Sequence, residues 1–363
     1  MATTSRKGSR VFFRSKEATA GTADTYDNFE GNSIIASFPT TSYMNESDKN
    51  KIGSGEHGRK SETQAVITPV SIKASRLSEV AYLMSYAMGT ADDVDVVASG
   101  VHMHTLKPFA VSSRTMPTTT MEYGNTVAAM DQFKHLIIND FSVTIGSSET
   151  GVIDATFNGF ANLHYLNTGV LTRNAAVNNS AFSAGNDFSA EPLINFFSTG
   201  SWIGATENTP FVPGSVDFNG SDLNGSTDLT AALNSITFGM NNGITQEMLL
   251  RAAGGGVINN AERGERSLTL ELQFRKDTDF AALSLANTQK ALEIQFAGPE
   301  IDTGYRYGMD LFWPVVQFMN PAQDDGSPIN ETVSCEVFEN SSAEAFIATF
   351  QSGVANGYNA TLT

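Results

Sequence analysis

Alternating apolar and polar positions dominate the chain and predict a mainly β protein. Such alternation over short runs is typical of strands with one buried face. One run spans residues 66–72, and a similar run spans 268–274. A helical period occurs at 77–88, where apolar side chains recur at intervals of three and four residues. We expect Ser75 to be the N-cap of this helix and Gly89 to end it in a left-handed conformation.

The order of these patterns occurs twice, which predicts two tandem copies of one domain. In each copy a strand is followed by a polar loop, a second strand, a helical pattern, a third strand and a hairpin. The predicted equivalent pairs are Ile34 and Ile236, Val70 and Leu272, Ile72 and Phe274, Leu77 and Phe280, Met121 and Ile294, Val143 and Val316, Ala155 and Cys335, and Phe157 and Val337. Any two amphipathic strands resemble each other, so this prediction depends on the shared order and not on one match.

We therefore predict two tandem β-sandwich domains, each with one short α-helix. The predicted parts are an N-terminal arm at 1–30, a first domain at 31–166 with an insertion at 90–118, an excursion between the copies at 167–225, and a second domain at 226–363. The arm holds a strand at 11–14, and Asp277 would cap the second helix. Pro69 lies inside a predicted strand and removes a backbone N–H, so that strand should lie at a sheet edge or form a bulge.

Composition limits the classes of function. The chain has 363 residues, of which 40% are hydrophobic and only 17% charged, with a net charge of −17. This charge disfavours tight binding to nucleic-acid phosphates. Cys335 is the only cysteine, so we expect a buried thiol and no intrachain disulfide. We also expect folding in a reducing cytoplasm without membrane insertion, because no apolar run approaches the length of a transmembrane helix.

Three motifs suggest chemistry, but none has the context that the chemistry needs. Residues 53–58 (GSGEHG) have the spacing of a dinucleotide-binding loop, yet a charged loop precedes them and a strand follows. His102 and His104 share one face of a strand without a third ligand, so we expect surface histidines. The sequence 324–326 (DDG) fits a hairpin turn. We predict no catalytic, cofactor-binding or metal-ligating residues, and no enzyme.

Two short stretches add a family resemblance to this pattern: residues 17–22 (EATAGT) and 121–124 (MEYG). Together with the duplicated sandwich and the long loop after each first strand, they resemble the major tail tube proteins of long-tailed bacteriophages. Segments 90–118 and 167–225 depart from the resemblance. It implies that three chains form a pseudo-six-fold ring, assembled in the host cytoplasm, and that rings stack into the hollow virion tail. The implied partners are further copies of the chain, tape-measure and tail-terminator-type proteins, and DNA in transit.

The resemblance also implies that the loops at 44–62 and 241–265 reach a neighbouring ring. The candidate stacking residues are Glu46, Asp48, Lys49, Lys51, Arg59, Lys60, Met248, Leu249, Leu250 and Arg251. An acidic lumen would repel DNA phosphates and let the DNA slide. The lumen candidates, which lie beside core residues or at opposite parity to them, are Asp140, Asp154, Glu271 and Glu336.

Two alternatives remain at this point. One is a capsid-decorating or fibre-like virion protein that uses similar sandwiches for attachment. The other is a two-module carbohydrate-binding protein, a class that usually presents exposed aromatic side chains. The only tryptophans are Trp202 and Trp313, and Trp313 falls in a predicted hairpin strand.

Overall fold

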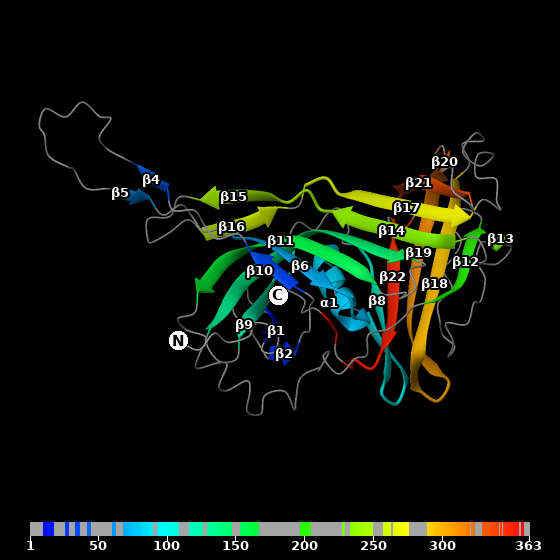
Figure 1. Ribbon diagram of the computed structural model, residues 1–363, viewed down its shortest axis with the longest axis horizontal. Coiled ribbons are helices and arrows are strands. Elements are labelled where there is room, and N and C mark those ends of the chain that lie inside the picture. The colour runs from blue at the N-terminus through cyan, green and yellow to red at the C-terminus, as the bar shows by residue number, and fades with distance from the viewer. Residues whose placement is uncertain are drawn as a thin grey trace, which may run out of the picture.

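The protein is mainly β, with strands of both predicted copies joined in one large antiparallel sheet (Figure 1). The computed structural model describes residues 10–17, 26–28, 33–36, 42–44, 60–62, 68–89, 93–108, 116–125, 129–146, 153–166, 197–204, 227–228, 233–249, 257–262, 264–275, 289–319, 321–323, 329–340, 342, 344–355 and 357–358. We call the part up to residue 166 the first half and the part from residue 197 the second half.

The first half builds its main sheet from seven described strands, with the longest of them at the centre. Its elements are β1 (Arg10–Lys16), β2 (Tyr26–Asn28), β3 (Ser33–Ala36), β4 (Ser42–Met44), β5 (Lys60–Glu62), β6 (Thr68–Ala74), α1 (Leu77–Met88), β7 (Asp93–Ala98), β8 (Val101–Leu106), β9 (Thr119–Asn125), β10 (Ala129–Gly146) and β11 (Asp154–Leu166). The order of hydrogen-bonded neighbours is β2–β1–β9–β10–β11–β6–β3. The strand predicted at 11–14 is confirmed within β1.

The second half repeats this order of pairings. Its elements are β12 (Phe197–Gly204), β13 (Thr227–Asp228), β14 (Leu233–Asn241), β15 (Thr245–Leu249), β16 (Val257–Glu262), β17 (Ser267–Arg275), β18 (Gln289–Asp302), β19 (Tyr305–Phe318), β20 (Ala322–Gln323), β21 (Asn330–Phe338) and β22 (Ile347–Ser352). The neighbours run β13–β12–β18–β19–β21–β17–β14. Each strand in this order therefore has a counterpart in the other half, whereas β7, β8, β20 and β22 stand outside this order of neighbours. The predicted helix after β17 lies outside the described residues.

The residue-by-residue correspondence differs from the predicted one. Ile72 lies opposite Phe157 in the first half. Its predicted equivalent Phe274 lies opposite Glu331 and not opposite Val337. Followed from Ile34 and Ile236, the ladders run through Ile72 to Phe157 in the first half and through Leu272 to Val333 in the second. The predicted pairs Ile72 with Phe274 and Phe157 with Val337 are therefore wrong, because their sequence offsets do not follow the register of the strands. The order of neighbours does not depend on these offsets.

The two halves share strands and a core. The C-terminal part of β10 pairs with β14, from Asp140 opposite Asn241 to Gly146 opposite Ser235. A second junction runs through β22, which pairs with β19 on one side and with β8 on the other. The insertion predicted at 90–118 thus contributes β8 to the sheet of the second half. The main cluster of buried apolar side chains also spans both halves.

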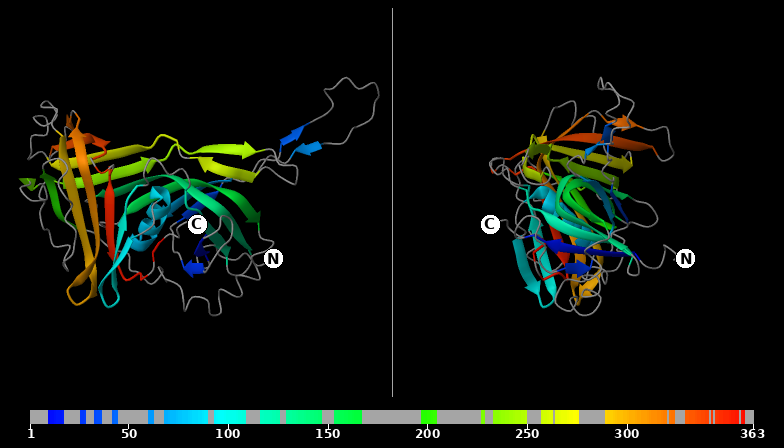
Figure 2. Two further views of the ribbon diagram at one scale, coloured as in Figure 1. Left: turned by 180° about the vertical axis from the view of Figure 1, so that it is seen from behind. Right: turned by 90° about the vertical axis from the view of Figure 1, so that its left-hand side faces the viewer.

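The helix α1 lies inside this shared core and packs on β10, β22 and β8 (Figures 1 and 2). All its side chains are buried. The prediction that Ser75 caps it is wrong: Arg76 occupies the N-cap position and forms no side-chain cap hydrogen bond. The predicted C-terminal Gly89 is confirmed, with φ of 84°.

The prediction that the strand around Pro69 lies at an edge or forms a bulge is wrong. β6 lies between β3 and β11, with no register shift in its described pairs. Pro69 is opposite Phe160 of β11, one residue before Val70, where the described pairing with β3 ends. Pro69 therefore lies, with Thr68 and Ala74, outside the part of β6 that has described partners on both sides.

Candidate assembly surface

A polar face runs across both halves, over β6, β11, β10, β14, β17 and β21. It follows from alternation along each strand: Phe141 and Val143 of β10 are buried, while Ser142 and Thr144 are exposed. Side chains in register across the strands form the rows Lys73–Thr156–Ser142–Gly239–Thr269, Ser71–Asn158–Asp140–Asn241–Ser267 and Asp154–Thr144–Thr237–Glu271–Ser334. We call this surface the polar face.

All the lumen candidates lie on the polar face. Asp154, Glu271 and Glu336 are exposed, while Asp140 is half-buried. Asp140 accepts hydrogen bonds from the side-chain amides of Asn158 (2.7 Å) and Asn139 (3.1 Å). The structure brings these carboxylates onto one continuous surface.

The rest of the polar face is dominated by hydroxyl and amide side chains. Lys73 and Arg275 are the cations placed on it, against the carboxylates of Asp140, Asp154, Glu271 and Glu336. The hydroxyls of Thr144 and Thr237 are 3.1 Å apart across the junction between the halves. Such a surface holds water and offers a nucleic acid few positive charges to bind.

Gly239 lets the halves approach closely at the centre of the polar face. A Cβ atom at this position would lie 2.5 Å from the carbonyl oxygen of Phe141 in β10. Backbone atoms cannot retreat from such a contact without distorting the β10–β14 ladder. This junction therefore requires glycine for steric reasons.

Each half carries a hairpin where a long stacking loop was predicted. β4 pairs with β5 and β15 pairs with β16, and both hairpins extend from the same end of the sheet (Figures 1 and 2). Of the candidate stacking residues, Lys60 lies in β5, and Met248 and Leu249 lie in β15. The others lie outside the described residues: Glu46, Asp48, Lys49, Lys51, Arg59, Leu250 and Arg251.

An asparagine cluster fixes the base of the β15–β16 hairpin. Asn139 lies at a register shift in β10. Its backbone oxygen accepts a hydrogen bond from the backbone N–H of Asn242 (2.9 Å), and its side-chain oxygen accepts one from the backbone N–H of Ile244 (2.9 Å). The side-chain amide of the buried Asn242 donates a hydrogen bond to the carbonyl oxygen of Ala87, near the end of α1 (2.7 Å). Its side-chain oxygen accepts a hydrogen bond from the guanidinium of Arg266 (3.2 Å). The cluster ties the hairpin to the first half.

This cluster was not predicted from the sequence, although part of its signal is present there. Asn-Gly pairs are typical of tight turns, and residues 241–243 read NNG. Gly243 has φ of 56°, and a Cβ there would lie 2.7 Å from the carbonyl oxygen of Glu265. The sequence indicates the turn, but not that it docks on a bulge in β10.

Glu17, the first residue of the EATAGT stretch, is a buried structural carboxylate. It accepts hydrogen bonds from the hydroxyls of Thr118 (2.5 Å) and Thr120 and from the N–H of His135 (3.0 Å). His135 has φ of 51°, at a second register shift in β10. Burial lowers the pKa of His135, an effect that the nearby Glu17 opposes. Glu17 therefore joins the end of β1 to β9 and β10.

The prediction of surface histidines is wrong for His104. It is fully buried, with Nε2 2.9 Å from the carbonyl oxygen of Val354 and its ring 4.1 Å from the ring of Tyr358. Burial, followed by the charge of His104, lowers the pKa of His102. Among the described residues no group of histidine, cysteine and carboxylate side chains could hold a metal ion.

Two buried carboxyl groups lie on β18 and β19, on the side away from the main core. Glu293 and Asp310 are at most 2% exposed, and the amide of Gln295 donates to Glu293 (3.4 Å). Burial, and next the charge of Glu293, raises the pKa of Asp310 well above its usual range. The predicted buried thiol is confirmed: burial raises the pKa of Cys335 to about 12.

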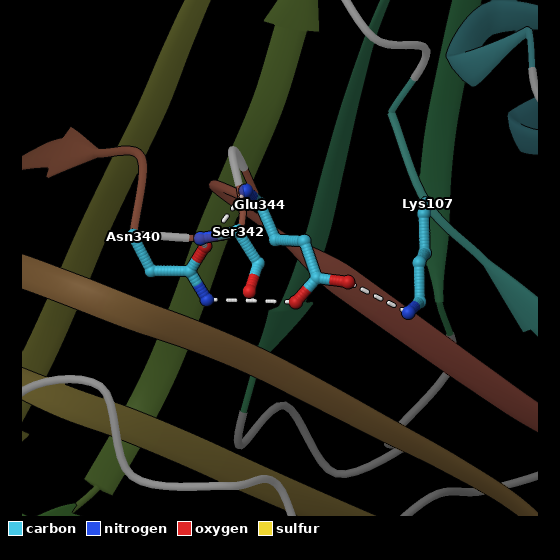
Figure 3. A network of polar contacts seen from close by, with 4 residues as sticks. All are labelled: Lys107, Asn340, Ser342 and Glu344. Atoms are coloured by element: carbon cyan, nitrogen blue, oxygen red, sulfur yellow. Dashed lines mark hydrogen bonds and ion pairs between the residues drawn. The ribbon is translucent and has the colours of Figure 1, made fainter.

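A polar network fastens the insertion to the second half (Figure 3). Lys107, which follows β8, forms an ion pair with Glu344 (2.7 Å). Asn340 accepts hydrogen bonds from the backbone N–H groups of Ser342 (2.9 Å) and Glu344 (2.8 Å). The network supports the same junction as the β8–β22 ladder.

Comparison with protein-family models and with curated proteins found no match for this chain. Within the described part of the chain, α1 falls short of the length and apolar character that a membrane-spanning helix needs.

Proposed function

We propose that this chain is a structural virion protein that assembles into stacked rings and forms the hollow tail tube of a long-tailed bacteriophage. Each half would be one tube-like β-sandwich domain. DNA would pass through the tube without tight binding. The further partners, as the family resemblance implies, are tape-measure and tail-terminator-type proteins.

The observation that carries the proposal is the β10–β14 junction. Two parts with the same strand order meet there through different edges, which makes the contact head-to-tail. A head-to-tail contact, applied again, produces either a closed ring or an open helix. Closure of the ring by three chains comes from the resemblance and is part of the proposal. A closed ring would also remove the exposed strand edges that promote aggregation.

The polar face supports the same function. It continues from the first half into the second, so a ring would extend it around an inner wall. Its excess of carboxylates agrees in sign with the net charge of −17. A wall that carries this charge and few cations would repel DNA phosphates.

The experiment is to measure the mass of gently assembled protein and to image it by negative-stain electron microscopy. We expect masses in multiples of three chains, together with rings or hollow tubes. A stable monomer that does not polymerise at high concentration would contradict the proposal. An image reconstruction with a basic inner wall would contradict the assignment of the polar face alone.

The carbohydrate-binding alternative needs exposed aromatic side chains, and one of the two tryptophans is buried. Trp313 is 1% exposed and packs against Phe346 and Phe238. A buried ring cannot form a sugar-binding platform. No contact among the described residues favours a capsid-decorating or fibre-like role over the tail tube.

A further inference from the structure

In the second half, β19 and β20 together take the place of the single long strand β10. β19 pairs with β21 as far as Phe318, and β20 then pairs with the earlier part of β21 (Figure 1). The register shifts by one residue between these two ladders, and β10 shows the same shift against β11 between Ile138 and Asp140. The end of β10 therefore has its counterpart in β20.

The ladders assign each residue of β20 a counterpart in β10. They are followed from Phe157 of β11 and Val333 of β21, which occupy equivalent places. The corresponding pairs are Phe141 with Pro321, Ser142 with Ala322, and Val143 with Gln323. The predicted equivalence of Val143 with Val316 is therefore wrong.

This correspondence identifies an open place in the second half. The end of β10 is the strand edge that β14 occupies, with Phe238 opposite Val143. The described pairs of β20 are all with β21, so its other edge has no partner among the described residues. We call Met319 and residues 321–323 the β20 edge.

Two apolar side chains beside the β20 edge are exposed, although their counterparts in the first half are in contact. Ile329, which precedes β21 by one residue, is 46% exposed, whereas Ile153, which precedes β11 by one residue, is fully buried. Met319 is 39% exposed. Its counterpart Asn139 contacts the turn after β14 through the N–H of Asn242. Both exposed side chains suit a surface that a further strand covers.

The strand that fits this place is β3, because it is the counterpart of β14. Its described pairs, from Ser33 to Ala36, are all with β6, and its other edge has no partner among the described residues. β14 uses the corresponding edge to pair with β10. In one chain the six strands β6, β11, β10, β14, β17 and β21 separate β3 from β20, so a contact between β3 and β20 joins two copies.

We infer that the β20 edge receives β3 of a second copy, with Ala36 of that copy opposite Gln323. The inference rests on the proposed ring, for which it supplies the contact between chains. The register follows from the internal junction, where Phe238, the counterpart of Ala36, lies opposite Val143. Repetition of this contact would continue the polar face from one chain into the next.

The contact between copies is weaker than the junction within the chain. In that junction Phe141 and Val143 are buried, and the carbonyl oxygen of Phe141 lies against Gly239 of β14. The N–H and carbonyl of one strand residue point to the same side, so the N–H of Phe141 also faces β14. Its counterpart Pro321 has no N–H to donate, and Gln323 is exposed. A proline at this place also lets the edge stay unpaired in the free subunit.

A disulfide between copies tests the inference in the full chain. In the double variant Ala36→Cys with Gln323→Cys, thiols of neighbouring copies would lie directly opposite each other, at a separation that a disulfide can bridge. Oxidation of the assembled protein should give covalent dimers and trimers on a non-reducing gel and nothing larger, because three links close the ring. The native Cys335 is buried with a pKa of about 12, so it should not compete for the disulfide.

The matched control is Ala36→Cys with Ala322→Cys. Ala322 precedes Gln323 in β20, and successive side chains of a strand point to opposite faces, so these thiols should stay unlinked. Equal linking of the control would overturn the register.

The outcomes separate the inference from the proposed function. If the unmodified protein forms rings but the Ala36 and Gln323 variant gives no disulfide between copies, the inference is wrong while the proposed function stands. If covalent species larger than trimers form, closure by three chains is wrong while the contact stands. If the unmodified protein forms no rings under any condition, the proposed function fails, and the inference with it.

A single variant tests why the contact is weak. Pro321→Ala restores a backbone N–H to the β20 edge without adding a large side chain. We expect rings at a several-fold lower protein concentration than for the unmodified chain. An unchanged or higher threshold, with the circular dichroism spectrum preserved, would overturn the role of Pro321.

Discussion

β10 and β19 occupy equivalent places in the order of strands, yet on the side away from the main core residues 142–144 of β10 and residues 310–312 of β19 have opposite environments. On β10, Ser142 and Thr144 face solvent. On β19, Asp310 and Phe312 are buried. Both strands present apolar side chains to the shared core. Alternation therefore determines which side of a strand enters the core, while the other side depends on what the rest of the chain places over it.

The largest expected effect is on tube elongation, and it should differ between the two hairpin loops. Leu249→Asp with Leu250→Asp should abolish tube elongation and leave the subunit folded, because each buried leucine contributes roughly 1.5–3 kcal/mol at a contact. Shortening residues 53–58 in the charged first-half loop should weaken stacking less, since exposed ion pairs contribute less than about 1 kcal/mol each. Electron microscopy and circular dichroism measure both effects. Full-length tubes from the double variant would show that the second-half loop does not mediate stacking.

The second prediction concerns the junction between the halves. Gly239→Ala should lower the free energy of unfolding by about 3 kcal/mol, because the added Cβ meets backbone of β10 and the core cannot expand to admit it. Gly353→Ala is the control, since its Cβ would lie 3.7 Å from the nearest backbone atom, an ordinary contact. Urea denaturation compares the two variants. Equal stability would mean that the β10–β14 contact is looser than described.

The third prediction uses the buried carboxyl group of β19. The folded state raises the pKa of Asp310, so between the unfolded and folded pKa values the native chain binds a proton that the unfolded chain has released. The free energy of unfolding should therefore fall as pH rises through this window, by up to about 1.4 kcal/mol per pH unit from this group. Asp310→Asn should remove that slope, whereas Asp154→Asn on the exposed polar face should not. Denaturation at several pH values measures the difference, and parallel curves for the wild type and Asp310→Asn would contradict the prediction.

The smallest effect belongs to the ion pair of Figure 3. Lys107 is 46% exposed, so Lys107→Ala should cost less than about 1 kcal/mol of unfolding free energy. High salt should lower the free energy of unfolding of the unmodified protein by a similar amount. A loss of several kcal/mol would mean that this pair, and not the β8–β22 ladder, holds the insertion to the second half.

Local patterns in the sequence were enough to predict the helix at 77–88, its final Gly89 and the recurrence of strand order. These features depend on periodicity and on conformations that few residues adopt. The buried state of His104 was not predictable in this way, because its partners Val354 and Tyr358 lie at the other end of the chain. The same limit explains why the β8–β22 ladder was missed: no local pattern indicates which distant strand will pair.

The candidate surface was predictable in part. Strand parity placed Asp140, Asp154, Glu271 and Glu336 away from core residues, and they do share one face. The register between strands was not predictable, and the misplaced equivalence of Phe157 and Val337 shows the error that follows. Glu17 was noticed only as part of a resemblance. Its role depends on a bulge at His135 that no propensity indicates.

The β8–β22 ladder also has a consequence for how the chain folds during synthesis. β8 is made well before its partner β22, since more than 200 residues separate Leu106 from Ile347. Contacts between such distant segments slow folding, because a long loop must close before they form. The helix α1 packs on both strands, so its final environment is complete only after β22 has been made. We therefore expect a single late cooperative folding step, with the first half unable to reach its native packing alone.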